Sequence, residues 1–301
     1  MTAPAVPYER GVAANQEEER VGGVARPRQD RIFLALDGSP AAASALPQAR
    51  AIASALGARL EVLYYPDFPA NSTAQPSLPR LRSSESFRLL SGADLIAALG
   101  EAVEGSDVRL LVLTSYGWEH DAESALSNAT LEVIRSISRP VLVVRPDAHR
   151  SNVPHGIERI LCPLDGTPRT AGAMAPAAHL ACQLGASLAV LYVLPPTLEQ
   201  PWEPGSVRTP RYMDHAYYDW MRWAEDLCES VDCPPDVAVK AFLACGDITE
   251  EIVRFADERE IDLIVLVRAS ALEAGHGLVI KHVLEKTPCP VLILGASQVQ
   301  R

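Results

Sequence analysis

The sequence has too few basic residues for a general nucleic-acid-binding protein. Its 301 residues include 27 lysines and arginines against 38 aspartates and glutamates, which gives a net charge of −11. A basic face is what meets the phosphates of nucleic acids and the anionic headgroups of membranes. The apolar runs also fall well short of the roughly 18 residues of a membrane-spanning helix. We therefore expect no nucleic-acid partner and no membrane association.

The six cysteines lack the spacing of a metal site. All of them lie in the second half of the chain, and no two form a C-x-x-C pair. Cys162, Cys182 and Cys289 fall within apolar patterns, where cysteine behaves as a small hydrophobe. A disulfide between Cys228 and Cys233 is the alternative. The sequence favours a reduced, cytoplasmic protein with no bound metal.

Common catalytic patterns are also missing. The Gly-rich dinucleotide fingerprint, the Walker phosphate loop and the nucleophile elbow G-x-S-x-G do not occur. His215 and His282 lie on expected helices without a partner at ligand spacing. We find no convincing Ser/His/Asp arrangement and expect no catalytic residue.

What the sequence does contain is an internal repeat. The phrase Asp-Gly-Ser/Thr-Pro occurs at residues 37–40 and again at residues 165–168, each time after a hydrophobic run. The same offset of 128 residues relates ALGARLEVLYY (residues 55–65) to QLGASLAVLYV (residues 183–193). A fixed offset over a long stretch indicates a duplicated unit.

Each copy of the unit alternates strands and helices. The strands are short runs rich in Val, Ile and Leu without clean alternation, which is typical of strands buried on both faces of a parallel sheet. The pattern predicts an α/β protein with two tandem, doubly wound domains, each a mostly parallel five-stranded sheet flanked by helices. In the second copy we expect strands at 158–164, 186–193, 236–243, 262–267 and 290–294, and helices at 168–184, 211–231, 247–259 and 275–286.

The two copies differ in the middle. The second copy has an extra aromatic segment at residues 211–231 with helical spacing, whereas the first copy has a proline-rich stretch at residues 66–80 that favours a loop. Residues 1–30 mix charges with Gly and Pro and show no apolar period, which is typical of a disordered tail. We expect the first domain at residues 31–147 and the second at residues 157–295.

The strand order and the position of the Asp resemble the universal stress protein family, over nearly the whole chain after residue 30. The motifs of the first copy are LALDGSP, RLLVLTSYG and RPVLVVRP; those of the second are LCPLDGTP, CGDITEEIVRFADEREIDLIVL and HVLEKTPCPVLIL. The resemblance implies an adenine nucleotide alpha hydrolase-like fold. It also implies that the last strands, Val141–Val144 and Val291–Leu294, pair within one chain. Unpaired N–H and C=O groups on apolar edge strands favour such a partner.

Asp37 and Asp165 follow the first strand of each copy, at the edge of the sheet where open α/β folds bind ligands. A carboxylate there could accept hydrogen bonds from a ribose or base, or help to hold a metal. The local sequence favours the plainer interpretation, in which the Asp stabilises the turn and the start of the helix.

Nucleotide-binding members of the family carry a phosphate loop after the fourth strand, with Gly, two residues, Gly, nine residues, and then Gly and Ser or Thr. In the first copy the spacing survives, but Thr114 and Ser127 replace two glycines and Asn128 takes the hydroxyl position. Three carboxylates inside the loop would repel a triphosphate unless a cation intervenes. The resemblance still implies a candidate site for ATP with magnesium, formed by Asp37, Val62, Gly117, Ser127 and Asn128.

The second copy departs further from the phosphate-loop pattern. Val267 replaces the first glycine, and the loop before Gly277 is three residues shorter. A β-branched residue is unfavourable where a backbone must approach phosphates. Arg268 and His276 could bind some other anion. Asp165 and Gly277 therefore remain only weak candidates for nucleotide binding.

Three functions remain open from the sequence. The favoured one is a non-catalytic, regulatory stress-response module that forms an intramolecular pseudo-dimer. The second is an adenine-nucleotide sensor that uses the first copy. The third, a slow ATP hydrolase, is the least favoured because no base that would activate water can be named. The sequence also leaves a homo-oligomer open.

Overall fold

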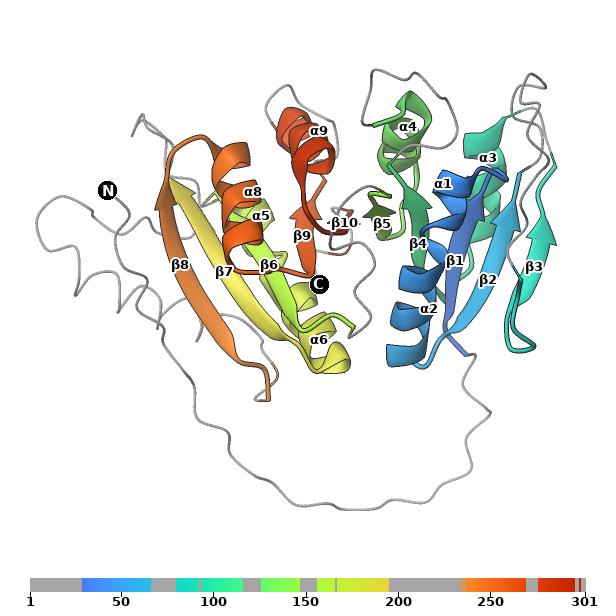
Figure 1. Cartoon of the computed structure of the whole chain (residues 1–301), viewed down its shortest axis with the longest axis horizontal. Coiled ribbons are helices and arrows are strands. Elements are labelled where there is room, and N and C mark those ends of the chain that lie inside the picture. Colours follow the sequence, from blue (N-terminus) through green and yellow to red (C-terminus); the bar gives the residue numbers. More distant parts are fainter. Residues whose placement is uncertain are drawn as a thin grey trace, which may run out of the picture.

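The structure is a computed structural model of the chain (Figure 1). It describes residues 29–65, 80–91, 94–115, 126–146, 156–165, 167–194, 234, 236–268, 276–295 and 298. Several sequence-based expectations concern residues outside these ranges. They are the tail at residues 1–28, the proline-rich stretch after residue 65, the aromatic helix at 211–231, Gly117, and the cysteine pair 228 and 233.

The described residues form one sheet of ten strands, of which each half supplies five. Within each half all neighbouring strands are parallel, and the order of the first half, β3-β2-β1-β4-β5, is that of a doubly wound fold. The predicted fold class is confirmed. The strands are β1 (Arg31–Leu36), β2 (Arg59–Tyr64), β3 (Ser86–Leu89), β4 (Val108–Thr114), β5 (Val141–Val144), β6 (Arg159–Leu164), β7 (Ser187–Leu194), β8 (Val239–Cys245), β9 (Leu263–Val267) and β10 (Val291–Leu294).

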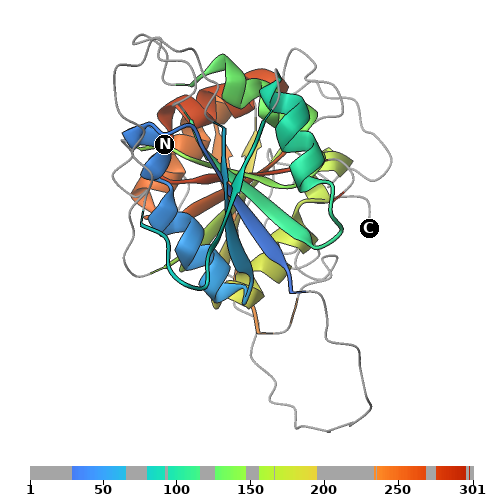
Figure 2. The same cartoon turned by 90° about the vertical axis from the view of Figure 1, so that its right-hand side faces the viewer.

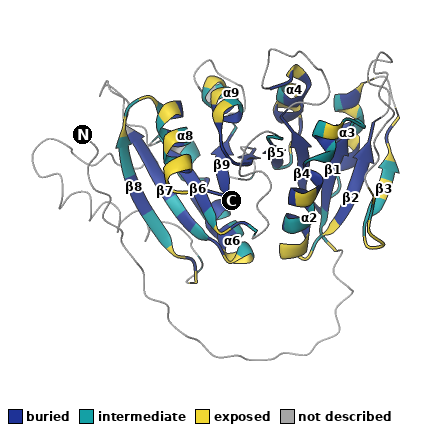
Figure 3. Ribbon diagram, in the orientation of Figure 1, coloured by how far each residue is buried: buried dark blue, intermediate teal, exposed yellow. Residues whose placement is uncertain are grey.

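Helices cover both faces of this sheet, and each face has its own apolar core (Figures 2 and 3). Ile32 and Leu34 of β1 point to one face and Phe33 to the other, as the two-residue period of a strand requires. The first face is covered by α1 (Pro40–Ala43), α2 (Leu46–Ala55), α5 (Pro168–Ala171) and α6 (Met174–Leu184). The second face is covered by α3 (Leu95–Val103), α4 (Asn128–Ser136), α8 (Ile248–Glu258) and α9 (His276–Lys286).

The two halves meet where β10 lies antiparallel to β5, with Leu292 opposite Leu142 and Ile293 opposite Val141. These are the two strands that we expected to pair. The five-stranded sheets are therefore not separate bodies but parts of one continuous sheet. Three side chains near this join add hydrogen bonds between the halves. Arg145 Nη1 donates to the carbonyl of Thr287 at 3.3 Å, and Arg268 Nη1 donates to the carbonyl of Ile134. Gln298 Nε2 donates to the carbonyl of Ser138 at 2.6 Å.

The single helix expected at residues 168–184 is wrong, because the chain forms two helices there, α5 and α6. The first half breaks in the same way between α1 and α2. Pro47 and Pro176 fall in the first turns of α2 and α6, and a proline has no N–H to continue a hydrogen-bond ladder from the preceding helix. The prolines therefore explain why both copies break at the same place.

Single residues mark several helix ends. The Ser39 hydroxyl accepts a hydrogen bond from the N–H of Ala42 as the N-cap of α1. Gly57 and Gly185 have φ values of +61° and +66° after α2 and at the end of α6, where a residue with a Cβ would be strained. The strand expected at residues 236–243 lies slightly later, as β8, where it pairs with β7 from Leu188 to Leu194.

The cysteine expectation is correct for two residues and wrong for one. Cys162 and Cys289 are buried in the core, whereas Cys182 is exposed on α6. Burial raises the pKa of the Cys162 thiol to about 12, so it stays protonated near neutral pH. Cys182 lies next to Ala181 of the buried stripe, and one residue of helix rotation is enough to turn it toward solvent.

Arg50 on α2 and Glu85 form a paired ion contact that fastens residues 80–85 to the helix. Nε and Nη2 of Arg50 donate to the two carboxylate oxygens at 2.6 and 2.7 Å, and the N–H of Arg82 donates to the same carboxylate at 2.8 Å. The hydrogen bond from Arg50, more than any other influence, holds the pKa of Glu85 below its usual value of 4.5. Ionised Glu85 is thus the form that the fold stabilises.

We expect Glu85→Gln to lower the free energy of unfolding by about 1.5–3 kcal/mol at neutral pH, the usual contribution of a hydrogen bond to a charged group. A carboxyl group with a lowered pKa in the folded state adds stability above its unfolded pKa and loses it as the pH falls through the folded pKa. Urea unfolding at a series of pH values should show the difference between wild type and variant shrinking below pH 4.5. A difference that does not change with pH would contradict a role for the ionised carboxylate.

Candidate functional site

Three of the candidate residues of the first half lie at one edge of the sheet. Asp37 directly follows β1, and β4 runs parallel beside β1, so the carboxyl ends of the two strands lie together. The start of α4 lies against this edge, because the N–H of Ser127 donates to the carbonyl of Ser115 at 2.8 Å. Asn128, the first residue of α4, is exposed. The structure therefore brings Asp37, Ser127 and Asn128 to the same edge.

Asp37 shapes the turn that leads into α1. Its Oδ1 accepts a hydrogen bond from the N–H of Ser39 at 2.8 Å, and Gly38 between them has a φ of +88° that favours glycine. Burial is the largest influence on the carboxyl group and raises its pKa, although hydrogen bonds from Ser39 act in the opposite direction. The Asp37 carboxylate thus already accepts a hydrogen bond within its own turn.

The hydroxyl of Ser127 also makes its hydrogen bonds within its own segment. It accepts from the N–H of Thr130 at 3.0 Å and donates to Oγ1 of Thr130 at 2.9 Å, so it caps α4 and is itself buried. Val62 is 0% exposed in the middle of β2, where it belongs to the core of the sheet. The structure therefore gives these two sequence-predicted residues clear roles in stabilising the fold.

Ser115 is a residue of this edge that the sequence did not single out. It directly follows β4, is 0% exposed, and its hydroxyl has no hydrogen-bond partner among the residues that the structure describes. A buried hydroxyl without a partner costs free energy, and such groups call for an explanation, which a bound ligand can supply. The only sequence signal was its place in the frame of the phosphate loop.

In the second half, Asp165 is held more tightly than Asp37. Its Oδ1 accepts from the N–H of Thr167 at 2.9 Å, from the Thr167 hydroxyl at 2.8 Å and from the Thr170 hydroxyl at 2.6 Å. At the position of Thr170 the first half has Ala42, whose side chain cannot donate a hydrogen bond. The carboxylate of Asp165 thus serves as the acceptor that joins β6 to α5.

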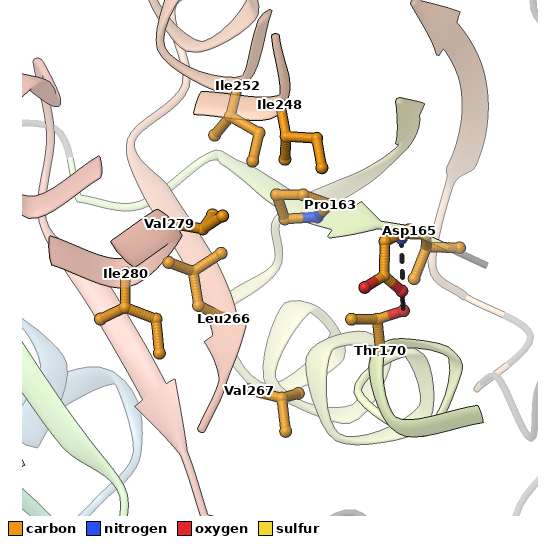
Figure 4. A pocket seen from close by; sticks show the side chains of 10 residues that line it. Pro163, Asp165, Thr170, Ile248, Ile252, Leu266, Val267, Val279 and Ile280 are labelled. Carbon is orange, nitrogen blue, oxygen red and sulfur yellow. Dashed lines mark hydrogen bonds between the residues drawn. The ribbon is translucent and has the colours of Figure 1, made fainter. Parts of the chain in front are cut away.

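A pocket of about 220 Å³ opens beside Asp165, between the carboxyl ends of β6 and β9 and the helices α8 and α9 (Figure 4). Asp165 and Thr170 lie on one side of it, and the other side chains are apolar. The pocket is lined by Pro163, Leu164, Asp165, Thr170, Ile248, Ile252, Leu266, Val267, Val279 and Ile280.

Two further candidates of the second half lie near this edge. Gly277 is the second residue of α9 and is partly exposed. Arg268, which the sequence offered as an anion ligand, instead donates to the carbonyl of Ile134 in the other half. Burial lowers the pKa of Arg268. Its side chain therefore connects the halves.

A sequence model of the universal stress protein family matches residues 156–295. The second half of this chain belongs to the universal stress protein family. The first half repeats the same strand order and the same Asp turn, so the chain is built as two domains of universal stress protein fold.

Solved structures of universal stress proteins have the same fold over most of the chain. One from Archaeoglobus fulgidus DSM 4304 has a TM-score of 0.61 at 15% identity and covers 88% of this chain and 98% of its own. A putative universal stress protein from Pseudomonas aeruginosa UCBPP-PA14 has a TM-score of 0.60 at 15% identity and covers 90% of this chain and 95% of its own. No curated protein matches this chain in sequence.

The described residues also bear on metals and membranes. Among them, no group of three or more His, Cys, Asp or Glu side chains is placed to hold a metal ion. None of the helices in the described ranges has the length and the apolar character needed to cross a bilayer.

Proposed function

We propose that this protein is a non-catalytic regulatory module of the stress response, which acts by binding and whose two halves work as one pseudo-dimer. The observation that carries the proposal is the state of the carboxylates at the two sheet edges. Asp37 accepts a hydrogen bond from its own turn, and Asp165 accepts three from the start of its own helix. Both carboxylates shape the loops in which they lie.

A carboxylate used in this way is poorly suited to hydrolysis. A general base must hold the proton of the attacking water within hydrogen-bond distance and take it up in the transition state. Three donors from the start of its own helix already contact Oδ1 of Asp165, so this oxygen is engaged in holding the turn. The side chains that face Asp165 across the pocket are aliphatic and offer no group to stabilise developing charge.

The connection between the halves supports the regulatory part of the proposal. The strands β5 and β10 are hydrogen-bonded neighbours, and Arg145 and Arg268 each donate across the join in opposite directions. Ligand binding at the sheet edge of one half would therefore act on a sheet that continues into the other half. A partner protein could contact both sheet edges at once, because the join holds them in a fixed arrangement.

An adenine-nucleotide sensor in the first half is the second candidate, and Ser115 favours it. Its buried hydroxyl has no partner among the described residues, and its carbonyl accepts from the N–H of Ser127 just before α4. Hydroxyl and backbone N–H donors at a helix start are suited to bind phosphate. In this alternative, ATP with magnesium would meet Asp37, Ser115, Gly117 and Asn128, and no hydrolysis would follow.

Two measurements on the full chain test the proposal. We expect phosphate release from ATP and magnesium to stay at the level of a blank without protein. Release above the blank that disappears in Asp37→Asn or Asp165→Asn would overturn the non-catalytic assignment. Calorimetric titration with ATP and magnesium then decides the second candidate. Saturable binding that Gly117→Trp or Ser115→Ala weakens, and that Ser187→Ala in the second half leaves unchanged, would support the nucleotide sensor.

A further inference from the structure

The pocket beside Asp165 has the character of a site for a molecule very different from a nucleotide. We propose that the second half binds a small, mainly hydrocarbon ligand with a single hydrogen-bond donor, such as a hydroxyl on an aromatic ring system, and that the donor points to Asp165 and Thr170. This inference rests on the proposed function, since it names the ligand class of a binding module, but it can fail while the absence of ATP hydrolysis still holds.

The size of the pocket limits the ligand. A cavity of about 150 Å³ lined by aliphatic and aromatic side chains holds benzene in an engineered protein, and drug-sized pockets begin at about 300 Å³. The volume of about 220 Å³ lies between these values. It therefore suits one or two fused rings or a short branched chain, and it is too small for an adenine base, a ribose and three phosphates together.

The lining determines the polarity of the ligand. Eight of the ten lining residues are apolar, and they come from the strands β6 and β9 and the helices α8 and α9 (Figure 4). An apolar surface of this kind favours hydrocarbon and gives phosphate oxygens no donor. Asp165 on the remaining side is a carboxylate, which attracts a donor and repels an anion. The net charge of −11 acts against an anionic ligand as well.

The corresponding residues of the first half are more polar than those that line this pocket. Positions that correspond through the repeat carry Thr114 where the second half has Val267, and Thr130 where it has Ile280. Thr130 Oγ1 donates to the carbonyl of Thr114 at 3.0 Å. In the second half an aliphatic side chain stands at each of these positions and lines the pocket. The two edges of one duplicated fold thus offer different chemistry, polar in the first half and apolar in the second.

The orientation of the ligand follows from the hydrogen bonds at the polar side. The Thr170 hydroxyl donates its proton to Asp165 Oδ1 at 2.6 Å, and its oxygen accepts from the N–H of Asp165 at 3.3 Å, so a ligand can meet this oxygen only as a further acceptor. Both polar side chains of the lining therefore present acceptors. A hydroxyl or amine N–H on the ligand can pair with them, whereas a carboxylate on the same ring system cannot.

The test uses 2-naphthol as probe and 2-naphthoate as its anionic counterpart, each titrated into the full chain and followed by calorimetry and by naphthol fluorescence. We expect one equivalent of 2-naphthol to bind, and 2-naphthoate to bind at least about tenfold more weakly, which corresponds to about 1.4 kcal/mol. Val279→Trp, which places a large ring in the pocket, should weaken 2-naphthol binding by at least about tenfold.

Two further variants keep the test independent of folding. Leu278→Trp makes the same change one residue away, on a side chain of α9 that is 53% exposed, and should leave binding unchanged. Val267→Thr keeps the shape, restores the hydroxyl of the first half, and should weaken binding without unfolding the chain. The proposal is overturned if 2-naphthol does not saturate the chain by about 1 mM, if Val279→Trp has no more effect than Leu278→Trp, or if 2-naphthoate binds equally well.

Discussion

Replacing Ile293 with proline will lower the free energy of unfolding of the chain by about 3 kcal/mol or more, because it removes a main-chain hydrogen bond at the join between the halves. The carbonyl of Pro290 accepts from Ile264 of β9 at 3.1 Å, and the carbonyl of Leu294 accepts from the residue that follows β9 at 2.8 Å. Polar groups alternate along a strand, so those of Val291 and Ile293 face β5. Ile293 lies opposite Val141, and the proline leaves a buried carbonyl of β5 without its donor.

The strands carry most of the connection on one face of the sheet. Between α2 and α6 a hollow of about 590 Å³ lies over the join, and Leu142 and Leu292 are part of its lining. The helices of that face therefore do not pack tightly across β5 and β10. On the other face, Arg145 and Arg268 contact the opposite half, but these few side-chain bonds cannot replace a ladder.

Leu89→Pro is the matched control for this prediction. It introduces the same residue into a strand of the same length, β3, but at the edge of the sheet. The N–H of Leu90 donates to Tyr64 at 2.8 Å, so the N–H of Leu89 faces away from β2, and its side chain is 59% exposed. We expect a cost within about 0.5 kcal/mol there, as for most surface changes. Urea unfolding followed by circular dichroism compares the two variants, and similar costs would show that the β5–β10 ladder contributes little.

The positions of most strands could be predicted because each strand is buried on both faces. Such strands leave a continuous apolar run in the sequence, as in VLVV of β5 and VLIL of β10. The order of the strands follows from the repeat and the right-handed crossovers of doubly wound folds. Helix ends marked by Ser39 or Gly185 carry a local signal in the sequence, since capping depends on near neighbours only.

The misplaced elements depend on information that is weaker or more distant. Pro47 and Pro176 were visible in the sequence, but an otherwise apolar helical period outweighed them in our interpretation. The bounds of β8 are set by its register with β7, from Leu188 opposite Val239 to Leu194 opposite Cys245, and not by its own composition. An apolar pattern with a period of 3.6 residues defines the buried face of a helix only to within about one residue. For that reason Cys182 was assigned to the wrong face of α6.

The apolar pocket could not be predicted at all. Ile248, Val267 and Val279 each resemble ordinary core residues in their own segments, and they lie on three different elements. Only the fold places them around one cavity beside Asp165. The sequence did indicate that Val267 is unsuited to a phosphate loop. It could not show that Val267 contributes to the apolar lining of a pocket.

Replacing Phe33 with alanine will lower the free energy of unfolding by about 3–5 kcal/mol, the usual cost of removing a fully buried aromatic side chain. Phe33 lies in the middle of β1 and is 0% exposed. The guanidinium groups of Arg31 and Arg88 lie over its ring, at 5.0 and 5.6 Å from the centroid. Glu61 holds both arginines in place, at 3.3 and 2.7 Å. Loss of the ring therefore removes apolar contacts and the support of two paired cations.

The duplicated fold supplies the control for this last prediction. The residue that corresponds to Phe33 in the second half is Leu161, which is also 0% exposed. Leucine thus fills the same place in a sheet of the same fold, and Phe33→Leu should cost distinctly less than Phe33→Ala, because most of the volume is kept. Urea unfolding of both variants gives the comparison. Leucine fills the core but cannot make the cation–aromatic contacts. Equal costs would therefore mean that these contacts, rather than the filling of the core, determine what Phe33 contributes to the free energy of unfolding.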